Sequence, residues 1–223
     1  DLLETTKALV SDVKKVGRPE MVFFPIGSDW FHVDNTTLST TRGTRQDCDG
    51  TYADIFFEGC DLAVEAIEMW RKIAPVELVL MLANHDLTSG LALLKFLSAY
   101  YKSEDDVSVT LSSEHRQYRK YGNNMFMWTH GDKTKPKRLA EVAAAESAMW
   151  GQCLYRSVFL GHLHHEMIDN FGVRLFQGPS LEIHSNWGHG LGFLGQLGQS
   201  CYMFDSKNGY FGSRFAKSNT GQS

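Results

Sequence analysis

Two apolar runs of the chain, MVFFPIG (21–27) and VELVLMLA (76–83), lead directly into residues that can bind a metal ion. Neither run alternates with polar residues, which is typical of strands buried on both faces of a parallel sheet. Helical periodicity precedes the first run, separates the two and follows the second, over residues 1–16, 51–73 and 87–101. This order of elements favours an α/β fold.

The second half of the chain is richer in predicted strands. They are expected at 107–113, 116–122, 124–131, 157–166, 173–180, 199–206 and 210–216. A helix is predicted at about 136–149, a hairpin turn at Gly122-Asn123-Asn124 and a glycine-rich loop at 185–198. Because no repeat, low-complexity run or linker divides the chain, we expect one domain over 1–223. Its expected architecture is an α/β sandwich of mixed β-sheets flanked by helices.

Composition excludes several classes of protein. Lys and Arg number 22 against 26 Asp and Glu, so the net charge is -4, and a protein whose whole surface coats nucleic acid is excluded. A local basic patch remains compatible with this charge. No apolar run approaches the roughly 20 residues of a membrane-spanning helix, and no apolar leader opens the chain. Four scattered cysteines without a CxxC pair indicate reduced thiols, so we expect a cytoplasmic protein.

Four segments place metal-binding side chains after an apolar run. They are GSDWFHVD (27–34), ANHD (83–86), THGD (129–132) and GHLHHE (161–166). Because ligands of α/β folds gather at the carboxyl ends of strands, these side chains are expected at one edge of the sheet. The candidates are Asp29, Asn84, His85, His130, His162 and His164. Carboxylate, amide and imidazole groups form the ligand set expected for Mn, Fe or Zn.

In this order the segments resemble the calcineurin-like metallophosphoesterases, in particular their bacterial and phage members. That family carries DxH, GDxxD, GNH[DE], a lone His and GHxH in sequence, and this chain matches the last four over residues 27–164. GHLH is intact, ANHD differs by one small residue, and Ser28 separates Gly27 from Asp29. SDWFH could instead be an altered DxH, but the loop, long helix and strand between Asp29 and Asn84 match the family's spacing. We therefore expect the first strand, with DxH, upstream of Asp1.

The resemblance implies a dinuclear metal site. Asp29 would bridge two divalent transition metal ions, with Mn favoured over Fe and Zn. Asn84, His130 and His162 would complete one metal site, and His164 would join the other. A metal-activated hydroxide would then attack the phosphorus of a phosphodiester or phosphomonoester.

The resemblance also implies that His85 acts as general acid, protonating the leaving oxygen, with Asp86 as an acidic neighbour whose role is open. The residues alone allow a simpler interpretation, in which His85 and Asp86 only cap the helix at 87–101. His32 and Asp34 could lie at the substrate mouth or solvate a loop, and we place His32 among the substrate-binding candidates.

Two basic clusters, HRQYRKY (115–121) and KTKPKR (133–138), bear on the substrate. Arg116 and Lys133 would bind phosphates, which favours a nucleic acid (DNA or RNA) or a nucleotide as the phosphorylated substrate. Both clusters could instead belong to a solvated surface strand and the start of a helix. The alternative to an enzyme is a non-catalytic binding or scaffold domain with an incomplete metal site, and a hydrolase that uses one metal is a third possibility.

Overall fold

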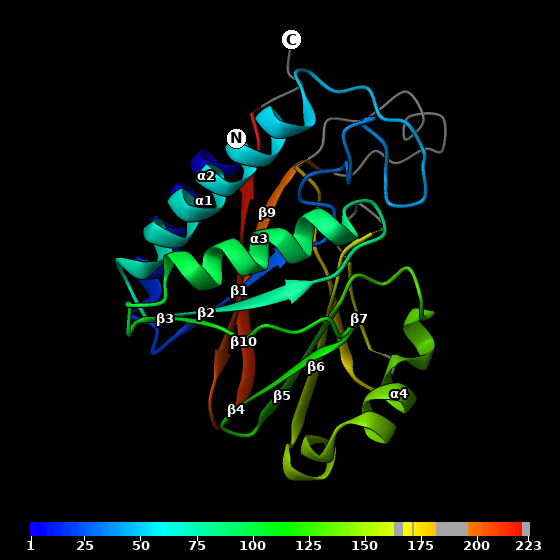
Figure 1. Ribbon diagram of the computed structural model, residues 1–223. Coiled ribbons are helices and arrows are strands. Elements are labelled where there is room, and N and C mark those ends of the chain that lie inside the picture. Colours follow the sequence, from blue (N-terminus) through cyan, green and yellow to red (C-terminus); the bar gives the residue numbers. More distant parts are fainter. Residues whose placement is uncertain (163–166, 171, 182–195, 220–223) are drawn as a thin grey trace. The chain divides into compact units, whose positions relative to one another are not determined.

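A computed structural model describes residues 1–162, 167–170, 172–181 and 196–219 (Figure 1). The chain divides into two compact units. The parallel-sheet unit comprises Gly17–His115, and the mixed-sheet unit comprises Asp1–Val16 with Arg116–Ser223. Helices and several β-sheets occur together, so the predicted α/β class is confirmed. The finer expectation, a metallophosphoesterase sandwich forming one domain, stays a prediction.

The parallel-sheet unit is built on three strands in the order β1-β2-β3, all parallel: β1 (Val22–Gly27), β2 (Val76–Met81) and β3 (Val107–Val109). Helix α2 (Tyr52–Arg71) joins β1 to β2, and α3 (Leu87–Tyr100) joins β2 to β3. The apolar runs therefore form adjacent parallel strands, as predicted. The strand expected at 107–113 is shorter and ends at Val109.

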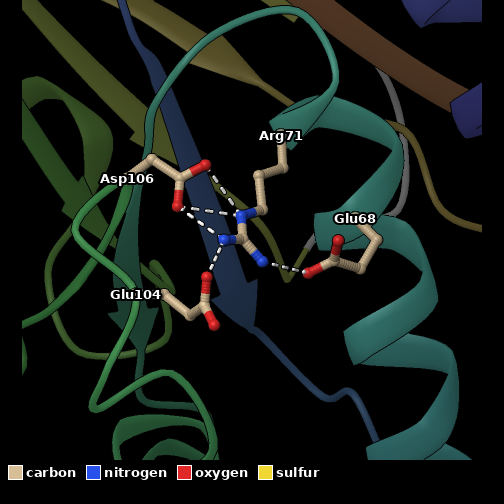
Figure 2. Close-up of polar contacts among 4 residues, drawn as sticks. All are labelled: Glu68, Arg71, Glu104 and Asp106. Carbon is tan, nitrogen blue, oxygen red and sulfur yellow. Dashed lines mark hydrogen bonds and ion pairs between the residues drawn. The ribbon is translucent and has the colours of Figure 1, made fainter.

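Both ends of α2 are held by side-chain hydrogen bonds. At its start Thr51 and Asp54 form a capping box, in which the Thr51 N–H donates to Asp54 Oδ2 at 2.9 Å. At its end the Arg71 guanidinium lies among three carboxylates (Figure 2). Nε donates to both oxygens of Asp106 at 2.8–2.9 Å, Nη1 donates to Glu68 at 3.0 Å, and Nη2 pairs with Glu104. Arg71 thus ties the end of α2 to the segment before β3.

The mixed-sheet unit contains a five-stranded sheet in the order β4-β5-β6-β8-β7 and a two-stranded sheet of β9 and β10. The strands are β4 (Gln117–Tyr121), β5 (Asn124–Thr129), β6 (Tyr155–Leu160), β7 (Met167–Asn170), β8 (Arg174–Gln177), β9 (Gly198–Asp205) and β10 (Gly209–Lys217). β5, β6 and β8 are parallel, while β4 and β7 run antiparallel to their neighbours. β4 and β5 form the predicted hairpin, with Gly122 at φ 54° in its turn.

Three sequence predictions in this unit need correction or lie outside the described residues. The helix expected at 136–149 is three pieces: a 3-10 turn at Pro136–Arg138, α4 (Leu139–Glu146) and a second 3-10 turn at Ala148–Gln152. Strand β7 was not predicted. The predicted strand at 157–166 is β6, which ends at Leu160; residues 163–166 and most of the glycine-rich loop at 185–198 fall outside the described ranges.

Alternating side chains give the five-stranded sheet two different faces. One face packs against α4 through aliphatic and methionine side chains, among them Met125, Met127, Leu139, Val158 and Leu175. The other carries an aromatic layer shared with the two-stranded sheet, which includes Phe126, Trp128, Phe159, Phe176, Tyr202, Phe204 and Tyr210. The sheet is therefore covered on both sides. Helix α1 (Leu2–Val16) lies against β9 and β10, where the hydroxyls of Thr5 and Thr6 donate to Gln199 Oε1.

Candidate functional site

The loop that follows β1 has an unusual backbone. Gly27 has φ 96°, and the next turn holds three non-glycine residues at positive φ: Ser28 (58°), Asp29 (68°) and His32 (61°). A Cβ at Gly27 would lie 2.6 Å from the Met81 carbonyl oxygen of the neighbouring strand, so this position requires glycine. Left-handed non-glycine residues are strained by about 1–3 kcal/mol each and persist only where surrounding contacts hold them. The loop is therefore held in place by its contacts.

The structure brings three predicted site residues of this unit together. The His85 N–H donates to Asp29 Oδ1 at 3.1 Å, joining the loop after β1 to the segment after β2. The His85 ring also meets His32, with the two Nδ1 atoms 3.1 Å apart and ring centroids 4.7 Å apart. Asn84 precedes His85 on the same segment and is half-buried. The segments after β1 and β2 thus bring a carboxylate and two imidazoles into contact.

Asp86 is buried, with 1% of its surface exposed, and its Oδ2 accepts the Phe31 N–H at 2.8 Å. Burial raises the pKa of Asp86 to about 7; the Phe31 hydrogen bond opposes this, and the charges of Asp29 and Asp34 add to it. Asp86 occupies the N-cap position of α3, but its side chain makes no capping hydrogen bond. The interpretation of Asp86 as a helix cap is therefore wrong for its side chain, which instead holds the loop after β1.

Asp34 makes the contacts at the start of α3. Its Oδ1 accepts the Ser89 N–H at 2.7 Å and the Ser89 hydroxyl at 3.0 Å, and its Oδ2 accepts the Thr41 hydroxyl at 2.8 Å. Partial burial raises the pKa of Asp34, but these hydrogen bonds outweigh it and the net shift is downward. Asp34 thus fixes the loop to the first turn of α3.

Helix α2 supports the same loop from another side. Phe31, 4% exposed, stacks on Phe56 with ring centroids 5.0 Å apart, and the Trp30 indole N–H donates to the Gly59 carbonyl at 3.0 Å. A Cβ at Gly59 would lie 2.3 Å from the Phe31 ring. Glycine at this helical position therefore allows the loop to approach the helix closely.

The mixed-sheet unit places two further candidates next to each other. His130 follows β5 and is 1% exposed; His162 follows β6 and has φ 69°. His162 Nδ1 lies 3.2 Å from His130 Nε2, and the Gly161 N–H donates to the His130 carbonyl at 3.1 Å. As expected for neighbouring parallel strands, the two imidazoles meet at the same sheet edge. His164, the other predicted ligand from this segment, lies outside the described residues.

The residues predicted to bind substrate differ in their surroundings. Arg116 is bound to Glu146 of α4, through Nε at 2.7 Å and Nη2 at 2.5 Å, and Tyr118 donates to the same carboxylate at 2.8 Å. The Arg116 bond holds the pKa of Glu146 below its usual range. Lys133 lies 3.3 Å from Asp132 Oδ2 and lines a pocket that α4 helps to form. Arg116, just before β4, and Tyr118 of β4 are thus both bound to α4, whereas Lys133 lines a pocket.

Sequence reasoning overlooked Gln177, the last residue of β8. It is fully buried, and neither atom of its amide has a hydrogen-bond partner in the described part of the chain. Gln177 pairs in register with Leu160, two residues before His162. The sequence does carry a signal for Gln177, namely a polar residue at the end of an apolar run. Gln177 ends the run VRLFQ, just as His130 and His162 follow apolar runs of their own.

No family model, curated protein or solved structure matches the chain significantly. The resemblance to the metallophosphoesterases therefore rests on the four motifs and their order. Of the helices within the described ranges, none is both long enough and apolar enough to cross a membrane.

Proposed function

We propose that the chain is a metal-dependent phosphoesterase of the calcineurin-like type. The observation that carries this proposal is the placement of the motif residues. In each unit they follow neighbouring parallel strands and lie in contact, Asp29 with His85 and His130 with His162. The order of the motifs along the chain supports the same conclusion.

The donor set fits a transition metal. Asp29 and Asn84 offer oxygens and His130 and His162 offer nitrogens, the combination suited to Mn, Fe or Zn. Two ligands bound to one ion at about 2.1 Å stand roughly 3.0–3.4 Å apart at octahedral or tetrahedral angles. The 3.2 Å between the nitrogens of His130 and His162 matches that separation. As the resemblance implies, Asp29, Asn84, His130 and His162 would hold one ion, and Asp29 and His164 would hold a second.

The chain's own residues then have distinct tasks. The bound ions would supply a hydroxide nucleophile and stabilise the charge of the transferred phosphoryl group. His85 gives its proton to the leaving oxygen, and its contact with His32 sets the orientation of its ring. Asp86 acts as a positioning residue, because it holds the Phe31 N–H and with it the loop that carries Asp29 and His32.

Metal analysis of the purified protein, with hydrolysis of bis(p-nitrophenyl) phosphate in Mn²⁺, tests the proposal. The wild-type chain should retain divalent metal and hydrolyse the ester, whereas His130→Ala should lose both. A wild-type chain that takes up no metal and hydrolyses neither this ester nor p-nitrophenyl phosphate contradicts the proposal and favours the non-catalytic binding domain.

The general-acid role predicts a separate result for His85→Ala. For a phosphoester with a poor leaving group, its turnover should fall by roughly 10²–10⁴-fold, the usual contribution of general acid catalysis, while its metal content matches the wild type. His115→Ala is the matched control, because His115 is an exposed histidine of the same unit. Loss of metal in His85→Ala would make His85 a ligand and contradict the acid role.

A further inference from the structure

A basic pocket lies on the segment that leads from His130 to α4. It has a volume of about 410 Å³ and is lined by Lys133, Thr134, Lys135, Arg138 and Val142. This volume falls within the roughly 300–1,000 Å³ of ligand-binding pockets and exceeds the space that a single phosphate needs. The lining combines three cations, a hydroxyl donor and one apolar side chain.

The pocket is a local positive region in an acidic chain. Residues 132–141 contain four cations against two carboxylates, although the chain as a whole carries a net charge of -4. Lys133 lies 3.3 Å from Asp132, and Arg138 lies 3.3 Å from Glu141, with both Arg138 and Glu141 more than half exposed. The Arg138–Glu141 pair is exposed on both sides and therefore weak, so an arriving phosphate can share Arg138. Lys135 forms no ion pair within the described ranges.

The structure separates this pocket from the other basic cluster. Arg116, just before β4, is bound to Glu146 at the end of α4, and Lys120 of β4 donates to Gln152 of the following 3-10 turn at 3.2 Å. Lys137 belongs to the same segment as the pocket residues but does not line the pocket. Of the basic residues in the two sequence clusters, Lys133, Lys135 and Arg138 therefore line the same pocket.

We infer that this pocket binds a phosphate and the adjoining nucleoside of a polynucleotide, beside the phosphate that is cleaved. The inference rests on the proposed function for the position of the cleaved bond. Lys133 follows His130 by three residues, so their Cα atoms are at most about 11 Å apart. Successive phosphates advance about 3.4 Å along a helical strand, and the pocket is thus within a few nucleotides of His130. The cations would neutralise the phosphate, and Val142 would contact the sugar or base.

Binding of a fluorescein-labelled single-stranded 12-mer, followed by anisotropy in EDTA, tests this inference without catalysis. Lys135→Glu should weaken binding about fivefold at 0.1 M salt and lower the salt slope by about 0.7, the contribution of one phosphate contact on a single strand. Lys137→Glu is the matched control, since it reverses the same charge two residues away and outside the pocket. Its affinity should stay within twofold of the wild type.

Three outcomes overturn the inference. Equal weakening by both variants means that the segment attracts polyanions only through its overall charge. No weakening by either variant excludes the pocket from polynucleotide binding. Displacement of the 12-mer by millimolar inorganic phosphate at constant ionic strength means that the pocket is a site for small phosphorylated compounds. Because the assay uses no metal, a failure of the proposed hydrolysis leaves its result unchanged, and the two proposals fail separately.

Discussion

The two units hold their candidate ligands in different ways. In the parallel-sheet unit, carboxylates accept backbone N–H groups from distant segments: Asp29 from His85, Asp86 from Phe31 and Asp34 from Ser89. In the mixed-sheet unit, His130 and His162 contact each other through their rings. The acidic residues of the parallel-sheet unit therefore stabilise the conformation of a strained loop. The two histidines of the mixed-sheet unit are instead positioned by the regular strands that precede them.

This difference predicts which substitutions should lower the stability of the fold and which should affect only metal binding. Changes to the carboxylates of the parallel-sheet unit should alter the loop as well as any metal site. Changes to the histidine pair should alter metal binding and leave the fold nearly intact. Of the three predictions below, the first asks whether the units are stabilised independently, the second compares a carboxylate of one unit with a histidine of the other, and the third concerns the ion pairs of Arg71.

The largest expected effect comes from Phe176, which is fully buried in the aromatic layer of the mixed-sheet unit. Phe176→Ala should lower the free energy of unfolding by about 3–5 kcal/mol, because it removes a large buried side chain and leaves a cavity. Urea unfolding followed by circular dichroism measures this loss.

Phe57→Ala is its control, since Phe57 lies on α2 and is 66% exposed; we expect a change within about 0.5 kcal/mol. A single shifted transition for Phe176→Ala means that the two units unfold together, and two transitions mean that they are stabilised separately. A loss below about 1 kcal/mol would contradict the aromatic packing.

A smaller loss is expected for Asp34→Ala, because it removes the hydrogen bonds to Ser89 and Thr41 at the start of α3. Loss of such a cap costs about 1–2 kcal/mol. His162→Asn should change the free energy of unfolding by less than about 0.5 kcal/mol, since asparagine tolerates positive φ. Thermal and urea unfolding of both variants compare the two units directly. Equal losses of unfolding free energy in the two variants would contradict the view that the carboxylates stabilise the fold and the histidines serve only metal binding.

The smallest effect concerns Arg71 and pH. Hydrogen bonds from Arg71 lower the pKa of Asp106 in the folded protein. Their contribution to the free energy of unfolding is therefore fully present above the unfolded-state pKa of about 3.9, and it is lost as the pH falls through the folded-state pKa. Between pH 6 and pH 2.5, wild-type stability should therefore fall more steeply than that of Arg71→Met. Arg18→Met is the control, because Arg18 donates to the Ile73 carbonyl, which does not titrate in this range. Parallel pH curves for wild type and Arg71→Met would show that the cluster adds no pH-dependent stability.

Regular elements were predicted well where periodicity extends over many residues. β1, β2 and the helices α1, α2 and α3 follow the expected ranges closely. β7 was missed because a four-residue strand carries too little alternation to be distinguished from a loop. The helix predicted at 136–149 is interrupted at Ser147, whose hydroxyl accepts the Met149 N–H and begins a new turn.

The candidate site was predictable only in part. The rule that polar residues after apolar runs meet at a sheet edge places Asp29 near His85, and His130 near His162. It does not predict that Asp34 anchors Ser89, or that Arg116 is bound to Glu146. Those contacts join residues 55 and 30 positions apart, and neither member signals the other in the sequence.

Glycine at position 59 reverses a common rule of protein engineering. Replacing a glycine inside a helix by alanine usually stabilises a protein by up to about 1 kcal/mol. At this position the new methyl group would occupy the space of the Phe31 ring, which neighbours His32 in the loop after β1. The two positions therefore depend on each other, and a bulkier residue at 59 is tolerated only together with a smaller one at 31. A library that varies α2 alone would select against every substitution at Gly59, although the helix itself would gain from most of them.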